Sequence, residues 1–230
     1  MLKMPAWDKL PESIRNEQCY EYYLLLKKRN MSIFFKRVFD LFVSSILLVI
    51  LFLPMLLIAI LIKLDSKGPA LFKQERVTNF GRHFHIHKFR TMKVDTEKNG
   101  QLTVGNDSRI TKMGAYLRKR RLDEIPQLID ILLGNMSFVG ARPEVPKYVS
   151  AYSDEMLATL LLPAGVTSDA AIEYKDEAKI LEQTDVDIDK CYIEQVLPEK
   201  MRINLQYLKN FNFKQDIRII YKTVVAVLFG

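Results

Sequence analysis

Residues 41–62 read LFVSSILLVILFLPMLLIAILI and contain no charged side chain. As a straight helix, these twenty-two residues would extend about 33 Å, close to the thickness of the hydrocarbon core of a bilayer. Pro54 lies inside the run, where a proline ring kinks or breaks a helix. The residues before it, Leu41 to Leu53, cover only about 20 Å. The run therefore predicts a helix that either spans a membrane or turns back within it.

The charges beside the run favour the helix that turns back. Positive residues select the cytoplasmic side of a membrane when one flank carries more of them than the other. Here the two flanks are equally basic, so both favour the cytoplasm, and we expect a re-entrant helix broken near Pro54. A spanning helix that tolerates the proline is the alternative. The basic residues are Lys27, Lys28, Arg29, Lys36 and Arg37 before the run, and Lys63, Lys67, Lys73, Arg76 and Arg82 after it.

The whole chain is basic as well, with 34 Lys and Arg residues against 27 Asp and Glu residues, a net charge of +7. Such a balance favours acidic partners, among them nucleic acid, anionic lipid and phosphorylated small molecules. Nucleic acid is the least expected of these, because acids interrupt the basic residues and no recognition motif occurs. Cys19 and Cys191 lie far apart without metal-ligand spacing, and we expect two structural thiols in a reducing compartment.

Residues 1–31 form an N-terminal extension in which a helix is expected to open at Pro11-Glu12-Ser13. Tyr22, Tyr23 and the cations that follow suit either a membrane interface or a helix packed against the protein. The same two alternatives apply to the last segment, which opens at Phe213. Its predicted apolar stripe consists of Ile217, Ile220, Val224 and Leu228.

Residues 70–77 and 82–90 predict a small β-hairpin around a turn at residues 78–81. Three histidines at every second position would share one face of the second strand. Lys88 and Arg82 repel a cation there and no nearby carboxylate completes a ligand set, so we do not expect a metal at His83, His85 and His87. Residues 93–108 predict a polar loop beside a site, with a helix starting at Asp107-Ser108. Residues 163–168 predict another loop, and residues 173–191 predict a solvated charged face.

A short helix is predicted after the acidic pair in Leu122-Asp123-Glu124-Ile125-Pro126-Gln127-Leu128. Proline is tolerated in a first turn, and Gly134-Asn135 provides an end signal. The two acids would then lie beside the unpaired amides and the positive dipole end of the helix. The expected apolar face has the spacing i, i+3, i+4 and i+7 and consists of Ile125, Leu128, Ile129 and Leu132.

Acids at a helix start are ordinary caps, but one cap explains only one of the two acids. The basic run Arg118 to Arg121 precedes the pair. Arg142 follows it, in front of a proline that restrains its backbone. Arginine forks bind phosphate oxygens in pairs, and helix starts attract anions. The arrangement therefore indicates chemistry on a phosphate.

Together these blocks resemble the bacterial sugar transferases, also called monotopic polyprenol-phosphate phosphoglycosyl transferases. The resemblance covers residues 32–230, and its specificity comes from the number of blocks in the same order. The blocks are Lys36-Arg37-x-x-Asp40, Gly68-Pro69-x-x-Phe72-x-Gln74-x-Arg76, Lys88-Phe89-Arg90-Thr91-Met92, Leu122 to Leu128, and Gly134-Asn135-Met136-Ser137-Phe138-Val139-Gly140-Ala141-Arg142-Pro143-Glu144.

The resemblance implies an α+β, mostly helical protein. Residues 32–64 would be a re-entrant membrane-anchoring helix, and residues 65–230 a compact catalytic domain with interfacial helices. That domain would lie on the cytoplasmic face of the bacterial inner membrane, in contact with its lipid. Members transfer a sugar-1-phosphate from a UDP-sugar to undecaprenyl phosphate. The product, an undecaprenyl-diphosphate sugar, begins an O-antigen, a capsule, an exopolysaccharide or a glycoprotein glycan.

The resemblance also implies roles for the site residues. Asp123 would be the nucleophile that forms an aspartyl phosphosugar, and Glu124, with Asp123, would hold Mg²⁺. Two alternatives stay open: direct attack by the polyprenol phosphate, and a non-catalytic, membrane-anchored scaffold that binds lipid. The residues expected to bind substrate are Arg118, Arg142, Lys88, Arg90, Gln74 and Arg76.

Overall fold

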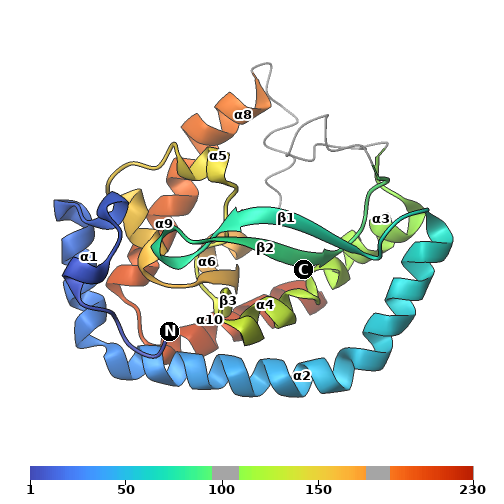
Figure 1. Cartoon of the computed structure of the whole chain (residues 1–230), viewed down its shortest axis with the longest axis horizontal. Helices are drawn as coiled ribbons and strands as arrows, with labels where there is room; N and C mark the ends of the chain where they lie inside the picture. Colours follow the sequence, from blue (N-terminus) through green and yellow to red (C-terminus); the bar gives the residue numbers. More distant parts are fainter. Residues whose placement is uncertain (95–108, 175–186, 230) are drawn as a thin grey trace.

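The computed structural model describes residues 1–94, 109–174 and 187–229. Over these residues the protein is mostly helical, with two small two-stranded sheets. The long helix α2 (Asn30–Asp65) runs along one edge of the molecule, and the hairpin of β1 and β2 lies across the molecule from it (Figure 1). The α+β, mostly helical class is thus confirmed. Most of the predicted 93–108 loop and of the charged 173–191 segment lies outside the described residues.

Helix α2 continues through Pro54 and bends in its second half (Figure 1). The predicted break is wrong in this respect, because a proline removes one backbone hydrogen bond and the neighbouring turns can accommodate the ring by bending. The helix is long and apolar enough to cross a membrane by length and composition. Within the most apolar 18-residue stretch of this helix, only 6% is buried inside the protein.

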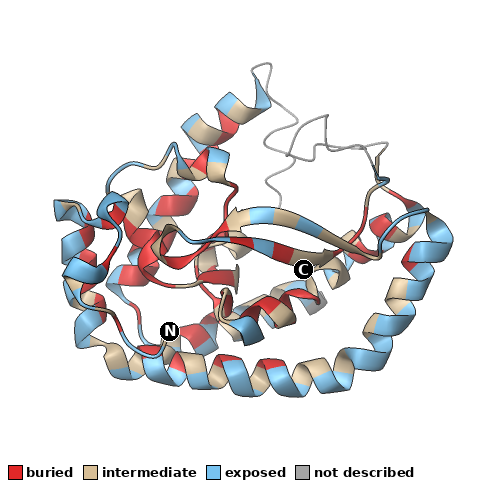
Figure 2. Cartoon of the chain, in the orientation of Figure 1, coloured by how far each residue is buried: buried red, intermediate tan, exposed pale blue. Residues whose placement is uncertain are grey.

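Helix α2 leaves many of its apolar side chains exposed, unlike a helix of a water-soluble domain, and much of its ribbon is pale blue in Figure 2. The side that faces the protein combines buried polar residues with apolar ones, among which Leu47, Leu48 and Leu51 pack against the core. The helix packs against α4 (Gln127–Leu133), α10 (Phe213–Phe229) and β3 (Met136–Val139). Its buried residues are Ile33, Lys36, Asp40, Ser44 and Ile62.

The N-terminal extension packs into the main hydrophobic core. Two short 3-10 turns, η1 (Trp7–Lys9) and η2 (Glu12–Ile14), precede α1 (Glu17–Lys28). The helix starts later than predicted, because the Asn16 side chain provides the cap by accepting a hydrogen bond from the Cys19 amide at 2.7 Å.

Of the two alternatives for this segment, the structure supports the packing helix. Tyr22, Tyr23 and Leu26 are buried in the same cluster as residues of η6 (Met156–Leu161) and α9 (Leu197–Lys209). Cys19 and Cys191 are both buried free thiols, as expected for structural cysteines.

The predicted hairpin is confirmed. Strand β1 (Leu71–Val77) pairs with the antiparallel strand β2 (His83–Phe89), and η3 (Asn79–Gly81) forms the turn. Two of the histidines each have a carboxylate partner. His83 contacts Glu75 at 2.9 Å, and His87 contacts the buried Asp130 at 2.8 Å. The first contact lies within the hairpin, and only the second joins the hairpin to α4.

The sequence did not reveal the second sheet. Strand β3 is parallel to β4 (Ala164–Thr167), which lies where a loop was predicted. The prediction was wrong because a glycine in this segment suggested a turn. Gly165 instead allows two backbones to approach closely, since a Cβ atom there would lie 2.1 Å from the Gly140 nitrogen.

Two helices lead to the acidic pair and away from it. Helix α3 (Lys112–Lys119) starts after Thr111, whose hydroxyl caps it, whereas the predicted start at Asp107-Ser108 lies outside the described residues. Helix α4 begins after Pro126 and ends at Gly134, whose φ is +83°, as the end signals predicted. Its predicted apolar face is right for Leu128, which is buried, and wrong for Leu132, which is exposed, while Gln127 and Ile131 are buried in addition. Ile125 precedes α4, so the helical spacing cannot be counted from it.

The remaining helices complete the domain: α5 (Pro146–Val149), α6 (Asp169–Glu173), α8 (Ile188–Cys191), the π-helical turn η7 (Tyr192–Val196), α9 and α10. Helix α10 packs against α2, α6, β3 and β4. It buries Asp216 and Ile219, while Ile217 and Val224 of the predicted stripe are exposed. Of the predicted stripe, Ile220 packs against the core, so the prediction is right for this residue and wrong for the two exposed ones.

Candidate active site

A sharp reversal of the chain places the acidic pair beside the end of α3. Arg121 has a φ of +55°, which is uncommon for a residue with a long side chain. The 3-10 turn η5 (Leu122–Glu124) follows directly, and α4 begins three residues later. Asp123 and Glu124 thus precede the positive end of α4, and Arg118 lies in the last turn of α3 on the other side of the reversal.

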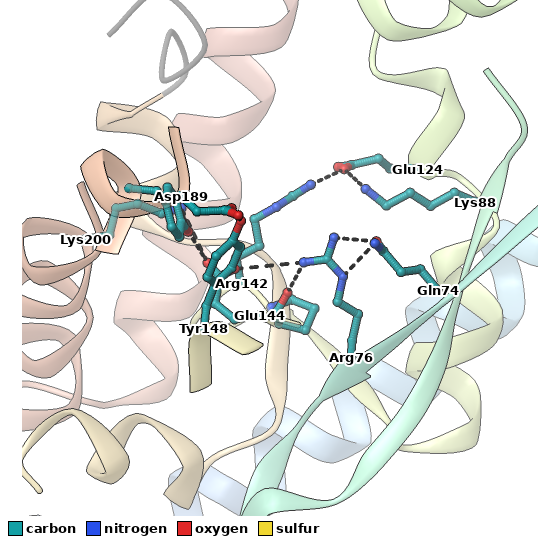
Figure 3. A network of polar contacts seen from close by, with 11 residues as sticks. Gln74, Arg76, Lys88, Glu124, Arg142, Glu144, Tyr148, Asp189 and Lys200 are labelled. Carbon is teal, nitrogen blue, oxygen red and sulfur yellow. Dashed lines mark hydrogen bonds and ion pairs between the residues drawn. The ribbon is translucent and has the colours of Figure 1, made fainter. Parts of the chain in front are cut away.

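Glu124 is held by two cations. Lys88 Nζ lies 2.9 Å from Glu124 Oε1, and Arg142 Nη2 lies 2.8 Å from the same oxygen (Figure 3). Burial alone would raise the pKa of Glu124, but Arg142 and Lys88 outweigh it and hold the pKa well below its ordinary value. Burial also lowers the pKa of the Lys88 ammonium. Glu124 is therefore an ionised carboxylate with its charge compensated.

Asp123 differs from its neighbour. Burial and the adjacent Glu124 raise the pKa of Asp123, and the attraction of Lys88 and Arg118 only partly offsets this effect. Within the described part of the chain, no other side chain donates a hydrogen bond to the Asp123 carboxylate. Arg118 donates from Nε to the Thr91 hydroxyl at 2.9 Å. Of the two acids, Asp123 is thus the one whose oxygens are not held in a direct ion pair.

Gln74 and Arg76 hold the segment that carries Arg142. Arg76 donates from Nη1 to the Pro143 carbonyl at 2.9 Å and from Nη2 to Gln74 Oε1 at 2.6 Å (Figure 3). The Val77 amide donates to the Glu144 carbonyl at 2.9 Å. Burial lowers the pKa of the Arg76 guanidinium. In this structure Arg76 contacts the backbone beside Arg142 and Gln74 contacts Arg76, so their described contacts do not include the acidic pair.

Glu144 anchors the other end of this segment, a role that the sequence did not reveal. Tyr192 donates its hydroxyl to Glu144 Oε1 at 2.6 Å. Lys200 Nζ lies 3.5 Å from the same oxygen and donates to the Tyr192 hydroxyl at 2.9 Å. Glu144 directly follows the Arg-Pro pair, which was a usable signal. Tyr192 and Lys200 lie far along the chain and gave none.

Arg90 is separate from these contacts. It is buried and donates to the carbonyl groups of Ser66, at 2.7 Å, and Lys67. These carbonyls directly follow α2. The structure therefore places the Arg90 guanidinium at the end of the long helix and not in the Glu124 cluster.

The two acids could together hold a divalent cation. Both Lys88 and Arg142 contact Glu124 through Oε1, which leaves Oε2 for another ligand. No group of three potential His, Cys, Asp or Glu ligands occurs among the described residues. Mg²⁺ needs no such group, since it is commonly bound by one or two carboxylates together with substrate phosphates and water. The donor set therefore fits Mg²⁺.

Comparison with known proteins decides the family. Residues 31–230 match the bacterial sugar transferase family. The chain belongs to this family. The match confirms the resemblance found in the sequence blocks. Together with the long apolar α2, membership indicates that this sugar transferase is associated with a membrane.

Individual relatives support the match. The UDP-N-acetylgalactosamine-undecaprenyl-phosphate N-acetylgalactosaminephosphotransferase of Aeromonas hydrophila is 34% identical over 202 residues, 86% of this chain and 44% of that protein. The exopolysaccharide production protein PSS of Rhizobium leguminosarum bv. phaseoli is 37% identical over 204 residues, 86% of this chain and 97% of that protein. This sugar transferase thus spans less than half of the first relative and nearly all of the second.

The UDP-glucose:undecaprenyl-phosphate glucose-1-phosphate transferase of Klebsiella pneumoniae is 33% identical over 196 residues, 83% of this chain and 39% of that protein. The family match begins at residue 31. Residues 1–30 of this sugar transferase therefore lie outside the family match, although they pack into its core.

Proposed function

We propose that this sugar transferase transfers a sugar-1-phosphate from a UDP-sugar to undecaprenyl phosphate. The products are UMP and an undecaprenyl-diphosphate sugar, with which the synthesis of a surface glycan begins. The observation that carries the proposal is the contrast between two adjacent acids: Glu124 is compensated by Lys88 and Arg142, whereas burial and Glu124 raise the pKa of Asp123. The names of the Aeromonas and Klebsiella relatives supply the substrate class.

In the proposed first half-reaction, an Asp123 carboxylate oxygen attacks the β-phosphorus of the UDP-sugar. The bond from that phosphorus to the bridging oxygen breaks, and UMP leaves with the bonding electrons. In the second half-reaction, a phosphate oxygen of undecaprenyl phosphate attacks the phosphorus of the aspartyl phosphosugar, and the Asp123 carboxylate is released. A covalent intermediate divides one difficult displacement into two easier ones.

The cations make these displacements possible, because a carboxylate must approach a phosphate of the same charge. Arg142, Lys88 and Arg118 surround the acidic pair and can bind the phosphate oxygens as the substrate displaces part of their present contacts. Glu124 and Asp123 would hold Mg²⁺ together with the diphosphate. When bound, the ion would neutralise charge that develops on the phosphate oxygens.

We further propose that α2 re-enters the membrane and that the site lies at the cytoplasmic face. The bend in α2, the exposed apolar side chains on both sides of Pro54, and the basic residues on both flanks support this topology. A site at the membrane surface can receive a water-soluble donor and a lipid-bound acceptor in turn.

The test is UMP release in the presence of Mg²⁺ and undecaprenyl phosphate, measured across a panel of UDP-sugars. We expect turnover with at least one donor, and Asp123→Asn should reduce it by at least about 10³-fold. Donor labelled in the sugar phosphate should label the wild-type chain when the acceptor is left out. An active but unlabelled chain would support direct attack by the lipid phosphate. Full activity of Asp123→Asn would rule out Asp123 as the nucleophile, and the absence of UMP release with every donor would support the non-catalytic scaffold.

A further inference from the structure

Two polar side chains of the long helix contact the strand that leads to Arg142. Lys36 Nζ donates to the Val139 carbonyl at 2.5 Å, and the Phe138 amide donates to Asp40 Oδ1 at 3.1 Å. Lys36 and Asp40 lie one helical turn apart on α2 and are only 4% and 3% exposed. Adjacent residues at the end of β3 are therefore held by the helix that enters the membrane.

The charge of Lys36 is compensated within the protein. Its ammonium lies 2.8 Å from Asp216 Oδ2 of α10, and the other oxygen of Asp216 accepts a hydrogen bond from the Tyr207 hydroxyl at 2.6 Å. A buried ion pair contributes little net stability compared with an apolar pair of similar volume. We therefore infer that the main role of Lys36 is to fix the position of Val139 and not to stabilise the fold.

That position bears directly on Arg142, three residues further on. The backbone groups just before Arg142 are fixed by hydrogen bonds. The Gly140 amide binds the Thr167 carbonyl at 3.0 Å, and the Ala141 carbonyl binds the Gly165 amide at 2.8 Å. Immediately before Gly140, Lys36 holds the Val139 carbonyl and Asp40 holds the Phe138 amide. Both side chains belong to α2.

We propose that Lys36 and Asp40 are positioning residues for Arg142. Through them, the position of α2 in the membrane sets the position of the guanidinium that binds phosphate. The inference rests on the proposed function. The two buried charged residues of α2 would align the site. When α2 shifts, the end of β3 shifts with it, and the distance between Arg142 and Glu124 changes.

The variant Lys36→Met combined with Asp216→Asn removes both buried charges and leaves the Val139 carbonyl without its donor. We expect a loss of about tenfold to a hundredfold in kcat/KM for the UDP-sugar, since small displacements of a binding group have effects of this size. In an Arg142→Met background, the same pair of changes should cost less than about twofold, because the group on which they act is already missing. Lys63→Met, at the exposed far end of α2, is the matched control and should match wild type.

Asp40 offers a second, milder test that does not disturb the ion pair. In Asp40→Asn, a side-chain oxygen can still accept from the Phe138 amide, so activity should stay within about threefold of wild type. In Asp40→Leu, the amide loses its acceptor, and activity should fall about tenfold or more, again only while Arg142 is present.

Equilibrium dialysis with UDP provides a readout that does not depend on turnover. We expect weaker UDP binding in the Lys36→Met, Asp216→Asn protein and no further weakening when Arg142 is already Met. Losses that multiply in the Arg142→Met background, in kinetics or in binding, would overturn the inference, as would wild-type behaviour of Asp40→Leu. A wild-type chain that binds UDP but releases no UMP from any donor would refute the proposed function, while the binding data would still decide the positioning role.

Discussion

At the scale of single residues, two adjacent carboxyl groups have opposite electrostatic environments. Glu124 has its pKa lowered because Arg142 and Lys88 outweigh its burial, whereas burial and Glu124 raise the pKa of Asp123. Pairs of acids whose pKa values are driven apart commonly divide two chemical roles between them. The sequence could predict that both acids matter, because they stand in a recognisable block, but it could not predict this difference in environment.

The first prediction concerns the pH dependence of labelling by the donor. Only ionised Asp123 can attack phosphorus, so labelling should decline as the pH falls through its raised pKa, above the ordinary value of about 3.9. Lys88→Met removes a cation that lowers this pKa, and the decline should therefore move to higher pH. The measurement is the rate of chain labelling between pH 4 and pH 8. A decline that moves to lower pH in Lys88→Met would contradict the assignment.

The second prediction concerns the buried anchor of the Arg142 segment. Lys200→Met leaves Glu144, which is 5% exposed, with Tyr192 and a distant Arg76 as partners. Breaking a buried ion pair in this way typically costs about 3–5 kcal/mol. Thermal unfolding in detergent should show a clearly lower Tm than wild type.

Lys190→Met is the control for this change, because Lys190 forms an exposed contact of 4.0 Å with Glu194 and such pairs contribute about 0–1 kcal/mol. Equal Tm values for the two variants would show that the Glu144 cluster is not an anchor.

At the scale of elements, the sequence was most informative where the pattern is local. The hairpin, the end of α4 at Gly134 and the length of α2 were all predicted, since turn residues and apolar runs act over a few positions. The parallel pairing of β3 with β4 was missed because its partners are far apart in sequence. The buried side of α2 was missed as well, because Lys36 and Asp40 find their partners only when α10 and β3 pack against the helix.

The third prediction tests the close approach of these two strands. Gly165→Ala places a methyl group 2.1 Å from the Gly140 nitrogen, which forces the backbones apart. Such overpacking should cost about 1–3 kcal/mol and reduce turnover, because it displaces the residues that precede Arg142. The measurements are Tm and UMP release.

Gly81→Ala is the matched comparison. Gly81 has a φ of +71° but no atom within 4 Å of the added carbon, so only the backbone strain of about 1–2 kcal/mol applies. It should lower Tm without reducing the turnover of the folded protein. Unchanged turnover in Gly165→Ala would mean that the spacing of the strands does not control Arg142.

The fourth prediction concerns the topology of α2. With a re-entrant helix, single cysteines at Asn30 and Ser66 both lie on the cytoplasmic side. Neither Asn30→Cys nor Ser66→Cys should then react with a membrane-impermeant thiol reagent in intact spheroplasts, and both should react after lysis. The native cysteines are buried and add little background. Labelling of one flank alone in intact cells would establish a spanning helix.

At the scale of the whole molecule, the N-terminal extension and the family domain share one hydrophobic core. Tyr23 is 1% exposed and packs in the same cluster as Leu161, Leu208 and Phe211. The sequence left its helix open between two environments, because tyrosines beside cations suit either of them. Only the presence of an apolar surface on η6 and α9 decided the matter.

The fifth prediction follows from this shared core. Tyr23→Ala should lower the free energy of unfolding by about 3–5 kcal/mol, as other large aromatic truncations in cores do. Tyr20→Ala, on the same helix but 42% exposed, should have a much smaller effect. Tm and the amount of protein that withstands proteolysis would compare them. Similar behaviour of the two variants would show that the extension is only loosely attached.

The buried charges of α2 have a consequence for biogenesis. A nascent α2 offers lipid an apolar surface but carries Lys36 and Asp40, whose partners Asp216, Val139 and Phe138 are synthesised more than ninety residues later. Until those residues emerge from the ribosome, the two charges have only water or lipid headgroups to stabilise them. We therefore expect α2 to reach its final packing only after the C-terminal helix has been translated.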